Sequence, residues 1–241
     1  GRDEYLTPLM RLVLPQLDRV RPSYALKEKG LARMYIAMHG INKDSPDAKE
    51  LLNWKRQDGP VRTLAANFPD KAFAVIEGRC NARAELKERL TVRTLNEFLD
   101  KLAAAETPPE KQSVLYAIHE RATAHEQRWV MRIILKEMHL GIKEESVLRL
   151  LHPDAAELYN TVCDLDETCR KCRDRTFRLE NIQLELFQPV RPRKAAREHW
   201  AAIDRTMRRK SGRGEKAGYV AQHKLDGERM VLHFARPADI P

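Results

Sequence analysis

Aromatic residues and long apolar runs are scarce in this sequence. Phe, Tyr and Trp make up 6% of its 241 residues. No apolar run approaches the roughly 20 residues that a membrane-spanning helix requires. The four cysteines suit a reducing compartment better than a disulfide-stabilised fold in a chain of this size. The first residues, Gly1-Arg2-Asp3-Glu4, lack the pattern of a secretory signal peptide. These absences exclude membrane-spanning and disulfide-rich secreted classes, so we expect a soluble globular protein without a membrane partner.

Basic residues are abundant. The formal net charge is +9 and the pI is near 9.5, which indicates a polyanionic partner, most plausibly nucleic acid. Ten basic and three acidic residues lie between Arg191 and Lys216, and they account for +7 of this charge. Such a run is either a solvated linker or helix face or a phosphate-contacting surface, and composition does not decide between them.

Helical patterns fill the first three quarters of the chain. Leu, Ala, Glu, Lys and Arg dominate the composition and favour helix over strand. Apolar spacing and capping residues predict helices over residues 5–14, 23–39, 48–54, 64–77, 91–102, 108–118, 123–138, 144–151 and 153–169. Pro69 is expected to interrupt the fourth, and Gly141 is expected to follow the end of the seventh.

The apolar period changes near residue 180. Ile182, Leu184 and Leu186 alternate with polar residues, which is typical of a strand. A further helix is predicted over residues 195–210, and two short strands are predicted to flank a loop within residues 219–234. We therefore predict a mainly α protein with two domains, a multi-helix domain over residues 1–178 and the first strands and helix of an α+β domain over residues 179–241.

A paired-cysteine motif invites a metal interpretation. Cys169 and Cys172 have the spacing of half a zinc site, but Cys163 is their only near neighbour of that type and no histidine follows at finger spacing. Ordinary cysteines on a helix are favoured, and we predict no metal ligands here.

The loop of the predicted C-terminal hairpin presents Lys224. A lysine must lose its proton before it can attack phosphorus, and its ordinary pKa of about 10.4 leaves almost none neutral at pH 7. Arg229, five residues on, is always cationic and could lower that pKa while holding a phosphate or ribose. Asp226 and Gly227 supply turn chemistry. Lys-x-Asp-Gly alone is a weak motif that a solvated hairpin tip would also match.

The wider run, KLDGERM at residues 224–230, resembles the nucleotide-attachment motif of the ATP-dependent DNA ligases. Upstream stretches resemble the helical DNA-binding domain of the eukaryotic DNA ligase IV family in the same order. They are LVLPQLD at 12–18, YALKE at 24–28, EQRW at 126–129, RIILK at 132–136 and HPDAAEL at 152–158.

This resemblance implies that Lys224 is adenylylated by ATP and that Arg229, with Leu225 beside it, contacts the nucleotide. His223 and Gln222 would also line the nucleotide site. The family usually has a glutamate at the position of Gln222, so a contact through the backbone would survive here and a role for the carboxylate would not. AMP would pass from the lysine to a DNA 5′-phosphate, which the 3′-hydroxyl then attacks.

The resemblance also implies cofactors, partners and a location. We expect ATP and Mg²⁺, with most metal ligands beyond Pro241, and double-stranded DNA ends or nicks as substrate in end joining within the nucleus. The first helices would dock an Artemis-type peptide, and the ligase's coiled-coil partner would bind outside this chain. Without an initiator methionine, the chain is expected to be a fragment that binds DNA but does not ligate alone.

Five positions are predicted to contact DNA backbone: Lys27, Lys136, His139, Gly141 and Lys143. Solvated surface is the competing interpretation for them.

Two other functional classes stay open. An RNA ligase or capping-type nucleotidyltransferase shares the lysine motif but is not expected to carry a long helical domain before it. A non-catalytic DNA-binding or partner-docking module would carry a vestigial lysine loop.

Overall fold

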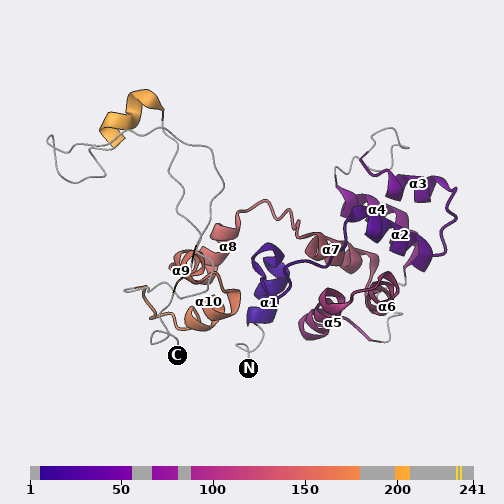
Figure 1. Cartoon of the computed structure of the whole chain (residues 1–241), viewed down its shortest axis with the longest axis horizontal. Coiled ribbons are helices and arrows are strands. Elements are labelled where there is room, and N and C mark those ends of the chain that lie inside the picture. The colour runs from indigo at the N-terminus through magenta and orange to yellow at the C-terminus, as the bar shows by residue number, and fades with distance from the viewer. Residues whose placement is uncertain are drawn as a thin grey trace. The chain divides into compact units, whose positions relative to one another are not determined.

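The computed structural model describes residues 6–55, 67–80, 88–179, 199–206, 232 and 234. The chain divides into two compact units, residues 1–182 and 183–241. Within the described residues the first unit is built from helices alone, which confirms the prediction of a mainly α protein (Figure 1). The predicted strands lie outside the described residues apart from Leu232 and Phe234, so they stay predictions. Among the described helices, none is long and apolar enough to span a bilayer.

The first unit contains helices α1 to α10 (Figure 1). Their bounds are α1 Leu6–Val13, α2 Glu28–Met38, α3 Pro46–Leu52, α4 Phe68–Ile76, α5 Val92–Ala104, α6 Pro108–His119, α7 Ala124–Leu135, α8 Glu144–Leu151, α9 Ala155–Val162 and α10 Leu165–Lys171. Single 3₁₀ turns lie at η2 Pro15–Leu17, η3 Glu77–Arg79 and, in the second unit, η5 Trp200–Ala202.

Helices α2 to α7 enclose the larger of two hydrophobic cores. Leu31 and Tyr35 of α2 meet Phe68 of α4, Leu99 of α5 and Met131 of α7 there, and all five side chains are almost fully buried. Burying a side chain of this size contributes about 1.5–3 kcal/mol relative to leaving it in water. The apolar faces predicted from helical spacing therefore point into one shared interior.

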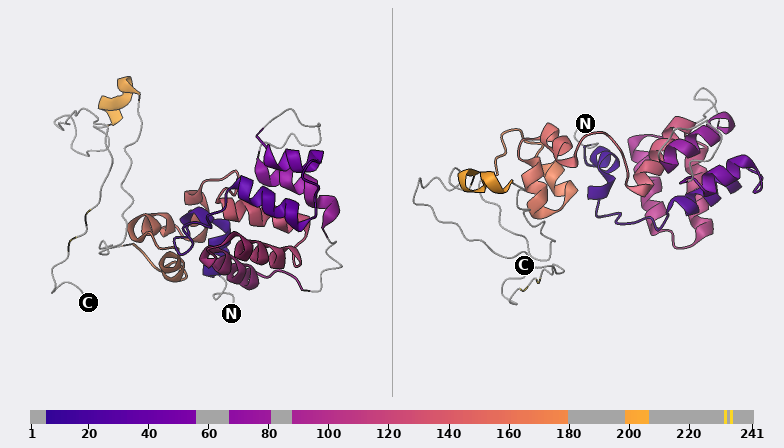
Figure 2. Two further views of the ribbon diagram at one scale, coloured as in Figure 1. Left: turned by 45° about the vertical axis from the view of Figure 1, so that its right-hand side comes forward. Right: turned by 90° about the horizontal axis from the view of Figure 1, so that it is seen from above.

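Helices α8 to α10 form the second core together with α1. Met10 and Leu14 pack there with Leu158, Tyr159 and residues of α10. Helix α1 also contacts α5, and its Leu12 belongs to the larger core. Figures 1 and 2 show α1 between these two groups of helices. Because α1 buries Leu12 in the larger core and Met10 in the second, it joins the two cores of the first unit.

Reciprocal side-chain caps begin three of the helices. In each, a threonine accepts a hydrogen bond from a backbone N–H in the first turn, and the residue three positions on returns a bond to the backbone of the threonine. The pairs are Thr91 with Thr94 at α5, Thr107 with Glu110 at α6, and Thr123 with Glu126 at α7. The predicted N-cap at Thr91 and the predicted capping box at Thr123 are confirmed.

Four predicted helix boundaries were wrong, each for a local reason. Helix α2 begins at Glu28 instead of near residue 23, because Lys27 has extended backbone dihedral angles. Pro69 does not interrupt α4 but lies in its first turn, where its missing N–H costs nothing. Helix α7 ends at Leu135, since Lys136 is left-handed. The long helix predicted from Pro153 is two helices, because Cys163 is left-handed at φ 52°.

Candidate nucleic-acid interface

Two loops that lie far apart in the sequence meet in the first unit. We call residues 18–27 the N-terminal loop and residues 136–143 the connecting loop. The ammonium of Lys136 donates to the carbonyl oxygens of Asp18, at 3.2 Å, and Arg21, at 2.6 Å. One lysine therefore attaches the start of the connecting loop to the N-terminal loop.

A buried polar network lies beneath this contact. Arg21 Nε is 2.7 Å from Asp18 Oδ2, and Arg21 Nη2 donates to Asn96 Oδ1 at 2.8 Å. Arg11 Nε lies 3.0 Å from Asp18 Oδ2, and Asn96 Nδ2 donates to the carbonyl oxygen of Pro8 at 3.0 Å. Arg21 is 1% exposed and Asp18 is 4% exposed. The network therefore connects α1, the N-terminal loop and α5 in a place that water hardly reaches.

The network fixes the charge states of its members. Burial alone would raise the pKa of the Asp18 carboxyl, but the hydrogen bond and charge of Arg21, with those of Arg11, outweigh it and lower that pKa. Burial lowers the pKa of the Lys136 ammonium, and the Asp18 charge opposes this. Asp18 is thus an anion held between guanidinium groups, and it fixes the backbone that Lys136 contacts.

Left-handed backbone recurs in both loops. Ala25 has φ 49° in the N-terminal loop. In the connecting loop Lys136 has φ 58°, His139 φ 49° and Gly141 φ 73°. Such conformations cost non-glycine residues on the order of 1 kcal/mol or more, and they are enriched at functional sites. Contacts with the surrounding structure must therefore stabilise the left-handed residues of both loops.

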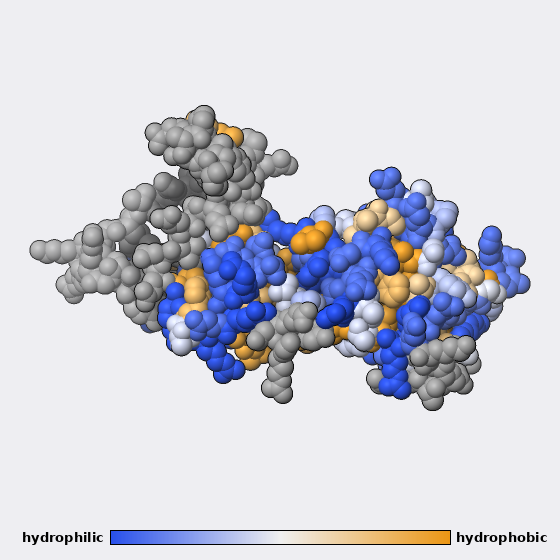
Figure 3. Space-filling view, turned by 90° about the horizontal axis from the view of Figure 1, so that it is seen from below, coloured by the Kyte–Doolittle hydropathy of each residue, from blue (hydrophilic) through white to orange (hydrophobic). Residues whose placement is uncertain are grey.

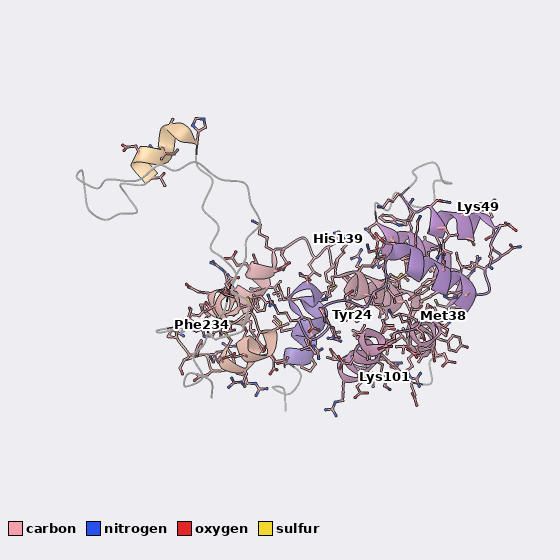
Figure 4. All side chains as sticks on the ribbon, in the orientation of Figure 1. Tyr24, Met38, Lys49, Lys101, His139 and Phe234 are labelled. Carbon is pink, nitrogen blue, oxygen red and sulfur yellow. The ribbon has the colours of Figure 1, made fainter. Side chains whose placement is uncertain are left out.

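Four of the five predicted DNA contacts are solvent-exposed. Lys27 occupies the N-cap position of α2 and Lys143 that of α8, while His139 and Gly141 lie between α7 and α8. Figure 4 shows His139 beside the connection that follows α7. The imidazole Nε2 of His139 is 3.7 Å from a Glu137 carboxylate oxygen. All of the predicted contacts except Lys27 lie in the connecting loop, and Lys27 lies at the end of the N-terminal loop.

Lys136 differs from the other four because its ammonium is already engaged with two carbonyl groups. Acidic residues also accompany the loop, with Glu137 inside it and Glu144 and Glu145 in the first turn of α8. The exposed cation in this loop is therefore Lys143, and backbone N–H groups are the other donors that a phosphate would meet.

Substituting Gly141 by alanine is expected to lower the free energy of unfolding by about 1 kcal/mol, because an alanine there must keep φ 73°. A Cβ at Gly141 meets nothing within 4 Å, so the cost is conformational and not steric. Urea denaturation followed by circular dichroism measures it.

Gly78→Ala is the matched control, since Gly78 has equal space and no left-handed φ. An equal loss of stability in both variants would contradict this explanation.

The ligase-like residues of α7 hold that helix against α4. Arg132 Nη2 is 2.7 Å from Asp70 Oδ1, and the Arg132 guanidinium lies 4.7 Å from the centre of the Trp129 ring. The guanidinium of Arg128 lies 5.0 Å from the centre of the Phe73 ring. These residues act in packing, although Trp129 remains 37% exposed.

The predicted adenylation residues fall outside the described residues. Lys224, Gln222, His223, Leu225 and Arg229 therefore stay predictions.

Cys169 and Cys172 are buried in the second core, and burial raises the pKa of Cys169 to about 12 and that of Cys172 to about 11.

Sequence reasoning missed the network around Asp18. Arg21 is one of 44 Lys and Arg residues, and nothing local distinguishes it from a surface arginine. Its partners Asn96 and Asp100 are more than seventy positions away. The one signal in the sequence was that Asp18 is the last residue of the ligase-like stretch LVLPQLD at 12–18.

Comparison with known proteins places the chain in a family. Residues 1–152 match the family described as "DNA ligase N terminus". The chain is 38% identical over 224 residues to "DNA ligase 4" of Arabidopsis thaliana, 37% over 229 residues to that of Gallus gallus and 34% over 229 residues to that of Homo sapiens. These alignments cover 93–94% of this chain and 18–24% of the relatives, so the chain spans about a fifth of their length.

The helical unit, its ligase-like stretches and the match over residues 1–152 agree with one another. The chain belongs to the DNA ligase N-terminal family.

Proposed function

We propose that this chain is the DNA-binding region of an ATP-dependent DNA ligase that seals double-strand breaks by non-homologous end joining. The observation that carries the proposal is the family match over residues 1–152, followed in the sequence by the KLDGERM run at 224–230. Helical domain and lysine motif occur in the order that a ligase requires. This order favours a DNA ligase over a capping-type enzyme.

In the proposed reaction Lys224 attacks the α-phosphorus of ATP. A P–N bond forms and the P–O bond to pyrophosphate breaks, which leaves AMP on the lysine as a phosphoramidate. Gln222, His223, Leu225 and Arg229 would contact the nucleotide. ATP and Mg²⁺ are the proposed cofactors, with most metal ligands supplied by sequence beyond this chain. Residues 179–241 would be the start of the adenylation domain, and residues 1–178 the DNA-binding domain.

The helical unit would grip duplex DNA through its sugar–phosphate backbone. The connecting and N-terminal loops support this role because they are linked through Lys136 and expose Lys143 and Lys27. Figure 3 shows a second feature of the unit, a face on which hydrophilic side chains predominate and apolar ones form separate small areas. Lys136 would act by positioning the two loops.

The test is the salt dependence of binding to a nicked duplex, measured by fluorescence anisotropy with the 241-residue chain. The logarithm of the affinity should fall linearly with the logarithm of salt concentration, with a slope near −0.9 per phosphate contacted. Lys27→Gln and Lys143→Gln should each weaken binding and reduce the slope by about 1, without changing sequence preference.

Lys49→Gln is the control. Lys49 is exposed on α3, and Figure 4 places it away from His139. A slope unchanged by Lys27→Gln and Lys143→Gln, or reduced equally by Lys49→Gln, would exclude these loops as the interface.

The proposed cellular setting is the nucleus. A coiled-coil partner would bind sequence outside this chain. An Artemis-type peptide would dock on the first helices, where Leu9 of α1 is 44% exposed and Val20 is 75% exposed. Exposed apolar side chains on adjacent segments support such a surface.

A further inference from the structure

Two histidines and a cysteine from three separate segments converge in the larger helical group. His39 follows α2, Cys80 follows η3, and His119 is the last residue of α6. One ligand atom from each, a ring nitrogen or the thiol sulfur, lies within 4.8 Å of the other two. The rings of His39 and His119 meet edge to face, with their centres 4.6 Å apart. All three residues are partly buried.

Three acceptors in and beside the cluster lie near one donor that has only two hydrogens. Gln127 Nε2 carries two hydrogens but lies 3.3 Å from Cys80 Sγ, 3.0 Å from His119 Nδ1 and 3.0 Å from the carbonyl oxygen of Ala122. His39 Nε2 is buried and has no hydrogen-bond partner among the described residues. Leaving a buried polar atom unsatisfied costs about 1–3 kcal/mol. A bound cation would satisfy the surplus acceptors.

We propose that His39, Cys80 and His119 bind a Zn²⁺ ion. Imidazole nitrogen and thiolate sulfur are the ligands that zinc prefers, at about 2.0–2.1 Å and 2.3 Å. Tetrahedral geometry at those lengths places ligand atoms about 3.3–3.6 Å apart, so the present cluster needs to contract by up to about 1.5 Å. Rotation about the side-chain torsions of these partly buried residues provides such a movement.

Burial shifts the pKa of two of the three proposed ligands. Burial, with the nearby His119 and Arg79, lowers the pKa of His39 to about 4, so its imidazole is neutral and able to coordinate at pH 7. Burial raises the pKa of the Cys80 thiol, and the Gln127 hydrogen bond opposes this. Zinc therefore has to displace the thiol proton, as it does at other cysteine ligands. The charge of Arg79 is offset by Asp47, 2.6 Å away.

Outer contacts would orient the ligands. With zinc bound at His119, the two hydrogens of Gln127 Nε2 remain for Cys80 Sγ and the Ala122 carbonyl. Three protein ligands leave the fourth position to water. Because the ligands lie at the C-terminal ends of α2, η3 and α6, the ion would tie together three segment ends.

The test is titration of the metal-free 241-residue chain with Co²⁺. One equivalent should produce the visible bands of tetrahedral cobalt and a thiolate-to-cobalt charge-transfer band, and Zn²⁺ should displace it. Cys80→Ser should abolish the charge-transfer band. His39→Asn and His119→Asn should each weaken binding by more than the roughly 10- to 100-fold typical of losing an outer partner.

His139→Asn is the control, because His139 is exposed and lies outside the cluster. Zinc should also slow the alkylation of Cys80 in the unaltered chain, measured by mass spectrometry. This measurement does not depend on whether a variant folds. A charge-transfer band that survives Cys80→Ser, an equal loss in His139→Asn, or alkylation of Cys80 that zinc does not slow would each overturn the proposal.

Discussion

Arg21→Ala is expected to lower the free energy of unfolding by about 3 kcal/mol. Arg21 is 1% exposed and pairs with an almost fully buried Asp18, and removing one partner of such a pair typically costs about 3–5 kcal/mol. We expect the lower part of that range because Arg11 remains 3.0 Å from the same carboxylate. Since domains typically have a free energy of unfolding of about 5–15 kcal/mol, this substitution removes a large part of the total stability. Urea denaturation measures the change.

The matched control is Arg149→Ala. Arg149 pairs with Glu145 at 2.6 Å, but both side chains are more than half exposed, so the loss should stay below about 0.5–1 kcal/mol. Similar losses in the two variants would contradict the role of burial.

The same substitution should change the response to acid. The pKa of Asp18 is lowered in the folded protein, so its contribution is present above the unfolded pKa of about 3.9 and is lost as pH falls through the folded value. Without Arg21, burial is offset less and the folded pKa moves up toward the unfolded one. The stability lost below about pH 4 should therefore be smaller in Arg21→Ala than in the unaltered chain.

Lys224→Ala is expected to abolish covalent AMP in a longer polypeptide that joins this chain to the C-terminal region of a "DNA ligase 4" relative. The P–N bond has no other proposed nucleophile, and loss of a covalent nucleophile removes the step that it performs. Incubation with α-labelled ATP and Mg²⁺, followed by denaturing electrophoresis, detects the adduct. The 241-residue chain by itself is expected to form little or none.

Lys216→Ala is the control, since it removes another lysine from the same basic region. Full adenylylation of Lys224→Ala would exclude Lys224 as the residue that attacks ATP. Absence of the adduct in the unaltered longer polypeptide would support the non-catalytic alternative, in which the lysine loop is vestigial. Robust labelling of the 241-residue chain would show that the adenylation site is complete within it.

Much of the helical unit was predictable because its signals are local. Residues within one or two helical turns determine the threonine caps of α5 and α7 and the apolar faces of α2 and α5. Two of the failures came where one left-handed residue decides where a helix ends. Lys136 and Cys163 are left-handed although nothing in their residue type favours that conformation, so their helices end earlier than apolar spacing predicts.

The sequence by itself determined the helical class and the basic character, and it carries the ligase-like run at residues 224–230, since composition, spacing and a contiguous run of residues hold this information. Only the tertiary structure decided that Arg21 is buried against Asp18 and Asn96 and that Lys136 holds two loops together. It also decided that His39, Cys80 and His119 share one site. Apart from Asp18 and Arg21, which are three positions apart, these partners are separated by tens of positions, and their chemistry depends on burial and on contacts that only folding provides.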